Sequence, residues 1–431
     1  MLTEINVHDA AGLSAWLKGR QQAASPEVMA SVADILGTVQ KEGDKALFEY
    51  SEKFDGIRPE SLAISKEQLE EEAQKADPQF VHALKLAADN IRSFHEHQIQ
   101  EGYLIHQDED VWLGQKVLPI DSAGLYVPGG RAQYPSSVLM NAIPAKVAGV
   151  RRVVMVTPPS RNGLINPNIA AAALVAGVDE VYAVGGAQAV GALAYGTKSI
   201  EPVDKIVGPG NVFVATAKRL VYGTVDIDMI AGPSEILVIA DEKANPRYVA
   251  ADLISQAEHD PMACAILIST SADLIEKVNE QLKEQSAKLP RKNIIEASLR
   301  DYGKSILVDS LDQALEIANA MAPEHLELQT ENAKELLDGV RNAGSIFVGE
   351  YSCESVGDYF GGCNHVLPTS GTARFSSALG VDAFLKRSCF LHYSAQALNR
   401  NGDHIVCLAN EEDLQGHANA VLIRKENGYG L

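Results

Sequence analysis

The segment Arg152-Val153-Val154-Met155-Val156-Thr157, closed by Pro158-Pro159, decides the fold class of this chain. A short apolar run that ends at prolines is typical of a strand buried on both faces of a sheet. Residues 169–176 then have the pattern of a helix, and Glu180-Val181-Tyr182-Ala183-Val184 is the next apolar run. Strand, helix and strand in this order predict a βαβ unit and therefore a mostly parallel sheet.

The same alternation extends in both directions from this segment. Upstream, the run Gly124-Leu125-Tyr126-Val127 ends in a Pro-Gly-Gly turn; downstream, a strand at 205–207 leads through Gly208-Pro209-Gly210-Asn211 into a helix. A second group of such units begins near Ser234. In it we expect strands at 236–240, 265–268, 305–308 and 345–349, and helices at 246–257 and 272–285. The predicted fold class is α/β, with two α/β domains.

The two ends of the chain differ from this middle part. Residues 25–100 carry apolar side chains at helical spacing, and from Asp382 onward we expect helix and then a tail. The predicted division is 1–122, a helical N-terminal section joining the first α/β domain; 123–233, the second α/β domain; 234–380, a return to the first domain; and 381–431, the C-terminal tail.

The amino-acid composition excludes some classes of binding partner for this protein. The 431 residues are 46% hydrophobic, which is ample for a buried core, and the net charge of −20 disfavours nucleic acid and anionic membranes. We find neither a signal peptide nor an apolar run of membrane-spanning length. The five cysteines form no C-x-x-C pair, which argues against a disulfide framework and a thiolate zinc site. We therefore expect a cytoplasmic protein that acts on a small molecule.

An acid and a base stand side by side in Pro323-Glu324-His325-Leu326. Adjacent side chains point in different directions, so Glu324 and His325 could address two sides of one substrate and perform two proton transfers. The alternative is a helix start with Pro323 in its first turn and Glu324 favoured by the helix dipole. Spacing alone favours this alternative.

Metal ligands are a second candidate chemistry. Gln256 and His259 are three residues apart at a helix end and could reach one ion, with Glu258 or Asp260 as further ligands; the alternative is a histidine that caps the helix. Later in the chain, imidazole and carboxylate groups recur in a glycine-flanked loop and in the tail. These residues are Asp358, His365, Glu412 and His417. Such nitrogen and oxygen donors suit zinc, provided that they converge.

Nucleotide binding and thiol catalysis are weaker possibilities. Glycines at Gly129-Gly130, Gly185-Gly186 and Gly208-Pro209-Gly210 could admit a pyrophosphate, although neither standard nucleotide fingerprint is present. Turn glycines explain each junction singly, whereas three junctions together favour a shared ligand edge. Cys353 and Cys363 lie near the candidate site, but buried, inert thiols are the better interpretation.

Eight motifs in order resemble those of the histidinol dehydrogenase family over nearly the full length. They are Gly124-Leu-Tyr-Val-Pro-Gly-Gly130, Val184-Gly-Gly-Ala-Gln-Ala189, Gly208-Pro-Gly-Asn211, Ala231-Gly-Pro-Ser-Glu235, Ser255-Gln-Ala-Glu-His259, Pro323-Glu-His-Leu326, Gly357-Asp358 and Asn364-His-Val-Leu-Pro-Thr369. The resemblance implies two incomplete Rossmann-like domains, of which 123–233 contacts NAD. It also implies that L-histidinol is oxidised twice by NAD, through bound L-histidinal, to L-histidine, the last step of histidine biosynthesis.

The resemblance also implies roles for individual residues. Zinc, one ion per subunit, would be held by Gln256, His259, Asp358 and His417, and these residues would hold the substrate as well. His417 would come from the partner subunit of a homodimer. His325 would be the general base and a substrate contact, and Glu324 would activate water. Further substrate contacts would be Ser234, His365 and Glu412, and NAD contacts would be Tyr126, Gln188 and Asn211.

One departure from the family lies close to these positions: Cys353 stands where the family has proline. Cys363, before Asn364-His365, stands where the family varies, and neither cysteine occupies a matched functional position. One alternative is a thiol-dependent aldehyde dehydrogenase, which also makes an acid from an aldehyde with NAD but needs a cysteine nucleophile. A non-catalytic metal-binding homologue is the other, although it would be expected to have lost site residues that are all present here.

Overall fold

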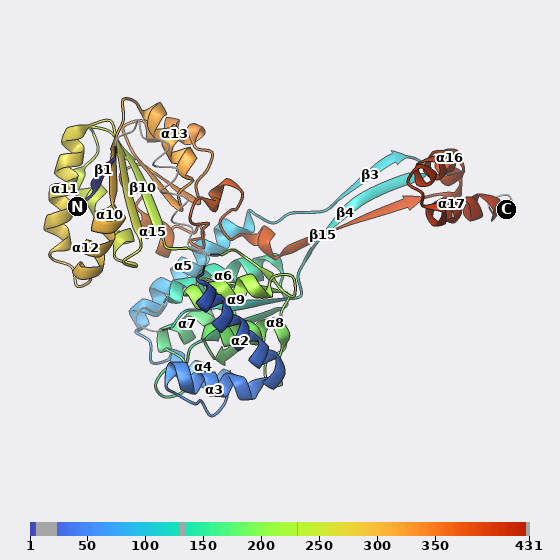
Figure 1. The fold of residues 1–431 in the computed structure, drawn as a ribbon, viewed down its shortest axis with the longest axis horizontal. Helices are drawn as coiled ribbons and strands as arrows, with labels where there is room; N and C mark the ends of the chain where they lie inside the picture. Colours follow the sequence, from blue (N-terminus) through green and yellow to red (C-terminus); the bar gives the residue numbers. More distant parts are fainter. Residues whose placement is uncertain (6–23, 130–133, 231, 428–431) are drawn as a thin grey trace. The chain divides into compact units, whose positions relative to one another are not determined.

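The computed structural model describes residues 1–5, 24–129, 134–230 and 232–427. The chain forms two compact units (Figure 1): one combines Met1–Gln98 with Ile120–Phe384, and the other combines Ile99–Pro119 with Leu385–Leu431. The first unit holds two six-stranded sheets, and the second holds a three-stranded sheet and two helices. Within the described ranges, no helix is long and apolar enough to cross a membrane.

The first sheet has the strand order β1-β12-β11-β10-β13-β14, and every pairing in it is parallel. Its strands are β1 (Thr3–Ile5), β10 (Glu235–Ala240), β11 (Cys264–Ser269), β12 (Lys304–Leu307), β13 (His325–Gln329) and β14 (Ser345–Val348). Apolar side chains of one face pack against three helices, α10 (Pro246–Ala257), α11 (Ala272–Ser286) and α12 (Lys292–Asp301). The other face packs against α13 (Leu311–Met321) and α14 (Ala333–Leu336).

The second sheet has the order β2-β7-β6-β5-β8-β9 and is parallel except at β2. Its strands are β2 (Ala63–Ile64), β5 (Ser122–Tyr126), β6 (Arg152–Thr157), β7 (Glu180–Ala183), β8 (Lys205–Val207) and β9 (Asp226–Ile227). Along β6, Val153 and Met155 face one apolar cluster, and Val154 and Val156 face the other. The predicted α/β class with mostly parallel sheets is confirmed.

Helices cover both faces of this second sheet, which explains why its strands read as unbroken apolar runs. On one side lie α4 (Lys66–Ala73), α5 (Pro78–Glu96), α6 (Pro135–Ala148) and α7 (Pro167–Ala176). On the other side lie α2 (Pro26–Glu42), α3 (Asp44–Asp55), α8 (Gly186–Tyr195) and α9 (Val212–Val221). The strand order reverses at β5, between β6 and β8, and open α/β sheets usually bind ligands at the carboxyl edge of such a switch point.

The second unit is an antiparallel sheet of order β15-β4-β3 followed by a helix pair. Its elements are β3 (Tyr103–Asp108), β4 (Val111–Pro119), β15 (Leu385–Tyr393), α16 (Ala395–Glu411) and α17 (Gln415–Asn427). The prediction of helix from Asp382 onward is therefore wrong over β15, although it holds from Ala395. All nine residues of β15 pair with β4, a partner remote in sequence, and Trp112 stacks on His392 at 4.8 Å.

Candidate active site

The acid and base pair lies at the entrance to β13 and not at a helix start. Helix α13 ends at Met321, Ala322 adopts a left-handed conformation (φ 52°), and the strand begins with His325. The helix-start alternative is therefore wrong. Parallel pairing of β13 with β10 and β14 overrides the local proline signal, and His325 is in register with Ile236 and Ser345.

Both side chains of the pair are buried and are held by the main chain of one residue, Glu235. The Glu235 N–H donates to Glu324 Oε2 at 2.9 Å, and the Glu235 carbonyl oxygen lies 3.1 Å from His325 Nδ1. His325 Nε2 has no hydrogen-bond partner among the described residues. The imidazole is thus anchored through one nitrogen, and its other nitrogen is available to a ligand.

Three carboxylates surround His325. Glu324 Oε2 lies 3.8 Å from Nδ1, and Glu354 Oε1 and Asp358 Oδ1 lie 3.9 and 3.8 Å from Nε2, too far for direct hydrogen bonds. Burial opposes protonation of the ring, but the charges of Glu354 and Glu324 outweigh it and raise the pKa of His325 well above its usual range. Burial raises the pKa of Glu324 to about 8. The pair therefore has the perturbed acidity typical of groups that exchange protons.

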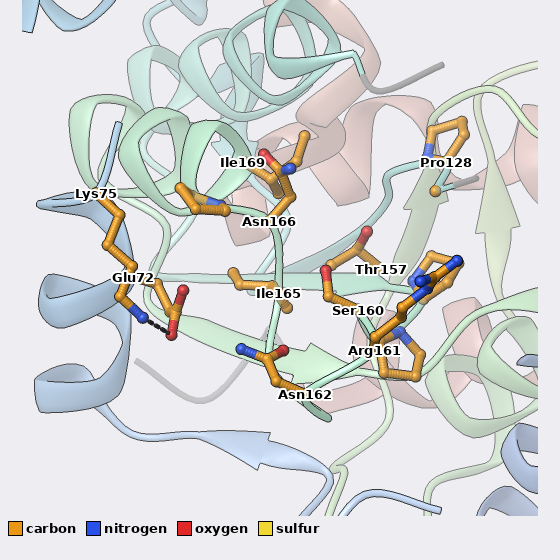
Figure 2. Close-up of a pocket in the computed structure, with 14 residues that line it drawn as sticks. Glu72, Lys75, Pro128, Thr157, Ser160, Arg161, Asn162, Ile165, Asn166 and Ile169 are labelled. Atoms are coloured by element: carbon orange, nitrogen blue, oxygen red, sulfur yellow. Dashed lines mark hydrogen bonds and ion pairs between the residues drawn. The ribbon is translucent and has the colours of Figure 1, made fainter. Parts of the chain in front are cut away.

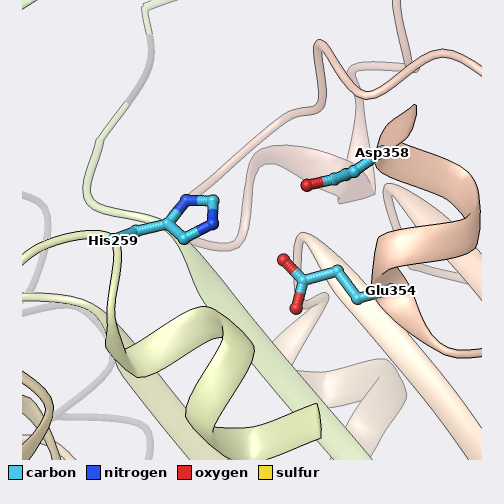
Figure 3. Close-up of side chains that lie close together, drawn as sticks. All are labelled: His259, Glu354 and Asp358. Atoms are coloured by element: carbon cyan, nitrogen blue, oxygen red, sulfur yellow. The ribbon is translucent and has the colours of Figure 1, made fainter. Parts of the chain in front are cut away.

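Metal-binding groups converge next to this pair (Figure 3). Nitrogen or oxygen atoms of His259, Glu354 and Asp358 all lie within 4.8 Å of one another. Glu354 and Asp358 come from one short helix, α15 (Glu354–Tyr359), and their carboxylates point toward the imidazole of His259. His259 lies two residues beyond the end of α10, which begins with an Asn245 cap and Pro246. The structure thus brings together two of the four predicted zinc ligands and adds one residue, Glu354.

Gln256, a third predicted ligand, is in the same cluster. It is fully buried in the last turn of α10. The end of its amide group that faces the cluster lies 3.0 Å from His325 Nδ1 and 3.2 Å from Glu354 Oε1. Gln256 therefore joins the acid and base pair to the carboxylates of α15.

The electrostatics of the cluster suit a cation. Burial lowers the pKa of His259, which keeps its imidazole neutral. Burial would raise the pKa of Asp358, but the imidazoles of His325 and His365 hold it below its usual range. A neutral imidazole beside an ionised carboxylate is the protonation state that metal binding requires.

The other predicted substrate contacts are divided between the two units: His365 and Ser234 lie in the same unit as the cluster, and Glu412 lies in the other. His365 lies beside Asp358, because its Nδ1 is 2.9 Å from the Asp358 carbonyl oxygen, and its Nε2 is 3.4 Å from Ser137 Oγ of α6. Ser234 directly precedes Glu235, the residue that anchors the pair. Glu412 follows α16 and His417 lies in α17, both in the second unit, so they belong to a different compact body from the cluster.

The predicted NAD contacts line the carboxyl edge of the second sheet. The Tyr126 hydroxyl, at the end of β5, accepts the Gly186 N–H at 3.0 Å, and burial raises the pKa of Tyr126 to about 12. Gln188 is buried, and both polar atoms of its amide lack partners among the described residues. Asn211 caps α9 through Oδ1, so this part of the side chain has a structural task.

The glycine junctions at this edge are close to one another. A Cβ at Gly129 or at Gly185 would meet the ring of Pro158 at 3.0 or 2.3 Å, and a Cβ at Gly208 would lie 2.2 Å from the Tyr126 carbonyl oxygen. Only glycine permits these approaches. The junctions at Gly129, Gly185 and Gly208 therefore share one edge; Gly130 lies outside the described residues.

A cavity of about 720 Å³ opens at the same edge, within the size range of small-molecule sites (Figure 2). The carboxyl ends of β5 and β6 and the start of α7 line it. Figure 2 shows Thr157, Ser160 and Arg161 on one side and the Glu72–Lys75 ion pair on another. The cavity thus lies at the carboxyl edge of the sheet, the edge at which open α/β folds usually bind ligands.

The sequence model of histidinol dehydrogenases matches residues 18–425 of this chain. The chain belongs to the histidinol dehydrogenase family. Histidinol dehydrogenase of Clostridium acetobutylicum is 54% identical over 408 residues, which are 95% of each chain. The enzyme of Bacillus subtilis is 49% identical over 409 residues, which are 95% of this chain and 96% of the relative. The crystal structure of histidinol dehydrogenase from Elizabethkingia anophelis has a TM-score of 0.93 at 37% identity and covers 99% of this chain and 98% of that one.

The resemblance inferred from the eight motifs is thus confirmed. The family consists of oxidoreductases that complete histidine biosynthesis. Sequence reasoning missed Glu354, although a signal was available. Glu354 precedes Asp358 by four residues, and this spacing places both carboxylates on one face of a helix.

Proposed function

We propose that this protein oxidises L-histidinol twice with NAD, through bound L-histidinal, to L-histidine. The observation that supports this most is the position of His325 Nε2: it is buried, has no partner among the described residues, and lies beside the metal-binding cluster. A substrate held by the cluster would present its hydroxyl to this nitrogen. We take family membership as the second support.

Zinc is the ion that we propose for the cluster. The imidazole nitrogen of His259 and the carboxylate oxygen of Asp358 suit this ion, and so does the amide oxygen of Gln256 when it is turned toward the cluster. Glu354 lies within reach as a further donor or as a neighbour that orients the others. When bound, zinc would hold nitrogen donors of the substrate and favour loss of its hydroxyl proton. One carboxylate among four ligands would leave the ion net positive.

His325 and Glu324 would divide the proton transfers between them. His325 would accept the hydroxyl proton in the alcohol oxidation. Its Nε2, which has no partner among the described residues, supports this role, and a cation held by Glu354 and Asp358 would offset the carboxylate charges that raise the pKa of the ring. In its ionised form, which dominates above its pKa of about 8, Glu324 would take a proton from the water that attacks the aldehyde, and its anchor on the Glu235 N–H would fix the carboxylate. The surrounding carboxylates would stabilise the imidazolium that forms on His325.

NAD would bind at the carboxyl edge of the second sheet, where it would accept the hydride. Three features support this placement: the amide of Gln188, which has no partner in the part of the chain that the structure describes, the Tyr126 hydroxyl and the glycine junctions. The adjoining cavity offers room for part of a dinucleotide.

We also propose a homodimer in which His417 of the partner subunit completes each zinc site. Taken by itself, the second unit has large exposed apolar side chains, among them Leu391 and Leu408, and such surface is typical of a protein interface. Ser234, His365 and Glu412 would contact the substrate. Cytoplasmic location stays a prediction from the sequence.

The structure gives little support to a thiol mechanism. The expectation of buried thiols is wrong, because Cys353 is half-buried and Cys363 is exposed. A catalytic cysteine needs a lowered pKa, however, whereas partial desolvation raises the pKa of Cys363. A non-catalytic homologue would not be expected to keep a buried imidazole nitrogen, His325 Nε2, that has no partner among the described residues and lies beside a cation site.

The deciding experiment is the stoichiometry of NADH formed per L-histidinol consumed by the purified, zinc-loaded protein. Two oxidations predict a ratio of about two. A ratio of about one would mean that the aldehyde is released, and no NADH at all would support a non-catalytic homologue.

A further inference from the structure

A buried polar cluster that the proposed reaction does not use lies next to the active site. It consists of Glu327 and Gln329 of β13 and Asp252 of α10, with exposures of 1%, 3% and 8%. Gln329 Nε2 donates to Glu327 Oε2 at 2.8 Å and to Asp252 Oδ2 at 2.5 Å. Burial, and then the charge of Asp252, raise the pKa of Glu327 well above its usual range.

Glu354, the first residue of α15, is held through its main chain by Glu327 and through its side chain by Ser255, which neighbours Asp252. The N–H of Glu354 donates to Glu327 Oε1 at 2.9 Å. Ser255 Oγ lies 3.1 Å from Glu354 Oε2 and 2.7 Å from the Asp252 carbonyl oxygen. Glu354 is thus fixed from β13 on one side and from α10 on the other.

Within the first unit, the cluster is linked to the strand that carries His325 and to the two helices, α10 and α15, that carry Gln256, Glu354 and Asp358. Alternation along β13 places Glu327 on the same face as His325, while Leu326 and Leu328 face the apolar cluster beneath α13. Asp252 precedes Gln256 by four residues, one turn of α10. Through Glu354, the cluster also reaches α15, which carries Asp358.

Two neighbouring carboxyl groups are a costly way to fill a protein interior. Apolar side chains of similar volume would often be neutral or stabilising at such a place. The arrangement becomes understandable if the cluster sets the geometry of the site, since groups behind metal ligands commonly determine metal affinity.

We propose that Glu327, supported by Asp252 and Gln329, is a positioning residue that sets α15 so that Glu354 and Asp358 face His259. The proposal rests on the zinc site of the proposed function. It assigns Glu327 to metal affinity and not to the stability of the fold.

The test compares substitutions of Glu327 in the full-length protein. Zinc affinity is measured by competition with a chelator, and the thermal midpoint of unfolding is measured on the same samples. Glu327→Leu fills the volume but removes the acceptor of the Glu354 N–H, and we expect zinc affinity to fall by roughly 10- to 100-fold. Glu327→Ala should give the same loss. Glu327→Gln keeps an amide oxygen that can accept the Glu354 N–H and gives up only the acceptor of Gln329 Nε2, so the loss of zinc affinity should be clearly smaller than in Glu327→Leu.

Leu328→Ala is the matched control, because Leu328 is the next residue of the same strand and faces the other side. It should lower the thermal midpoint through the cavity it leaves, without changing zinc affinity. Wild-type zinc affinity in Glu327→Leu or Glu327→Ala would overturn the proposal, and so would an equal loss in Glu327→Gln or in Leu328→Ala. Wild-type protein that binds no zinc would instead refute the proposed function on which this inference rests.

Discussion

Replacing Glu324 by glutamine should separate the two oxidations. Glutamine keeps the shape of the side chain, and its amide oxygen can accept the Glu235 N–H that Glu324 Oε2 accepts at 2.9 Å. The orientation should therefore persist while the proton acceptor is lost. A water activator contributes roughly 10²- to 10⁴-fold, so aldehyde oxidation should slow by this factor, or about 2.7–5.5 kcal/mol in its barrier.

The alcohol oxidation should suffer much less. His325 would lose a carboxylate 3.8 Å from Nδ1, but it would keep Glu354 and Asp358 at 3.9 and 3.8 Å from Nε2. Loss of one such charge lowers the pKa of the imidazole by about one to three units, and only part of this appears in the rate of proton transfer. We expect the first step to slow by about tenfold.

Single-turnover measurements of NADH formation, started from L-histidinol and separately from L-histidinal, distinguish the two effects. The variant should also release histidinal when it starts from histidinol. Zinc content and the thermal midpoint must match the wild type for the comparison to hold. Equal slowing of both oxidations, or normal oxidation of histidinal, would refute the assignment of Glu324 as water activator.

Three further predictions concern the metal, a buried carboxyl group and the thiols. His259→Asn should abolish zinc retention and activity together; metal analysis checks this, and full activity in metal-free protein would contradict the site. Burial raises the pKa of Asp55 from an ordinary value near 3.9 to about 6, so folding takes up a proton between these values and stability is lost as pH rises through about 6. Asp55→Asn lacks this loss, so at pH 7 its free energy of unfolding should exceed that of wild type by about 1–2 kcal/mol, after allowance for solvent screening. Below a pH of about 3.9 it should have no advantage. Denaturant titrations at pH 7 and below a pH of about 3.9 test this, and an equal gain at both would exclude ionisation as the cause. The double variant Cys353→Ala with Cys363→Ala should retain turnover, whereas lost activity with intact fold and zinc would favour a thiol mechanism.

Most of the fold was predictable because its signals are local. The apolar runs of β6, β10 and β11 and the Pro246 start of α10 need only neighbouring residues to be read. Two predictions failed where remote partners decide the structure. The segment from His325 becomes a strand because β10 and β14 flank it, and 385–393 becomes a strand because β4 pairs with it.

The sequence predicted which residues belong to the candidate site better than it predicted how they are arranged in space. Gln256 and His259 share a helix end that spacing reveals, and the motifs supplied Asp358 by resemblance. The convergence of His259 with Asp358 depends on the connection between β14 and α15, which no local pattern encodes. Glu324 and His325 are anchored by main-chain atoms of Glu235. Every residue type has a main-chain carbonyl and nearly all have an N–H, so such contacts cannot be recognised from the sequence.

The long separation between the strands of the second unit has a consequence for synthesis of the protein. Strand β4 leaves the ribosome early, but its partner β15 follows only after roughly 265 further residues, which take on the order of 13–50 s to translate. Throughout that interval the β3–β4 hairpin presents an open edge that will later pair with nine residues of β15. Open edges recruit other strands, so crowding of nascent chains should divert this hairpin into intermolecular pairing before its own last strand exists. Slower initiation of translation, or a chaperone that covers the hairpin, should therefore raise the yield of folded protein.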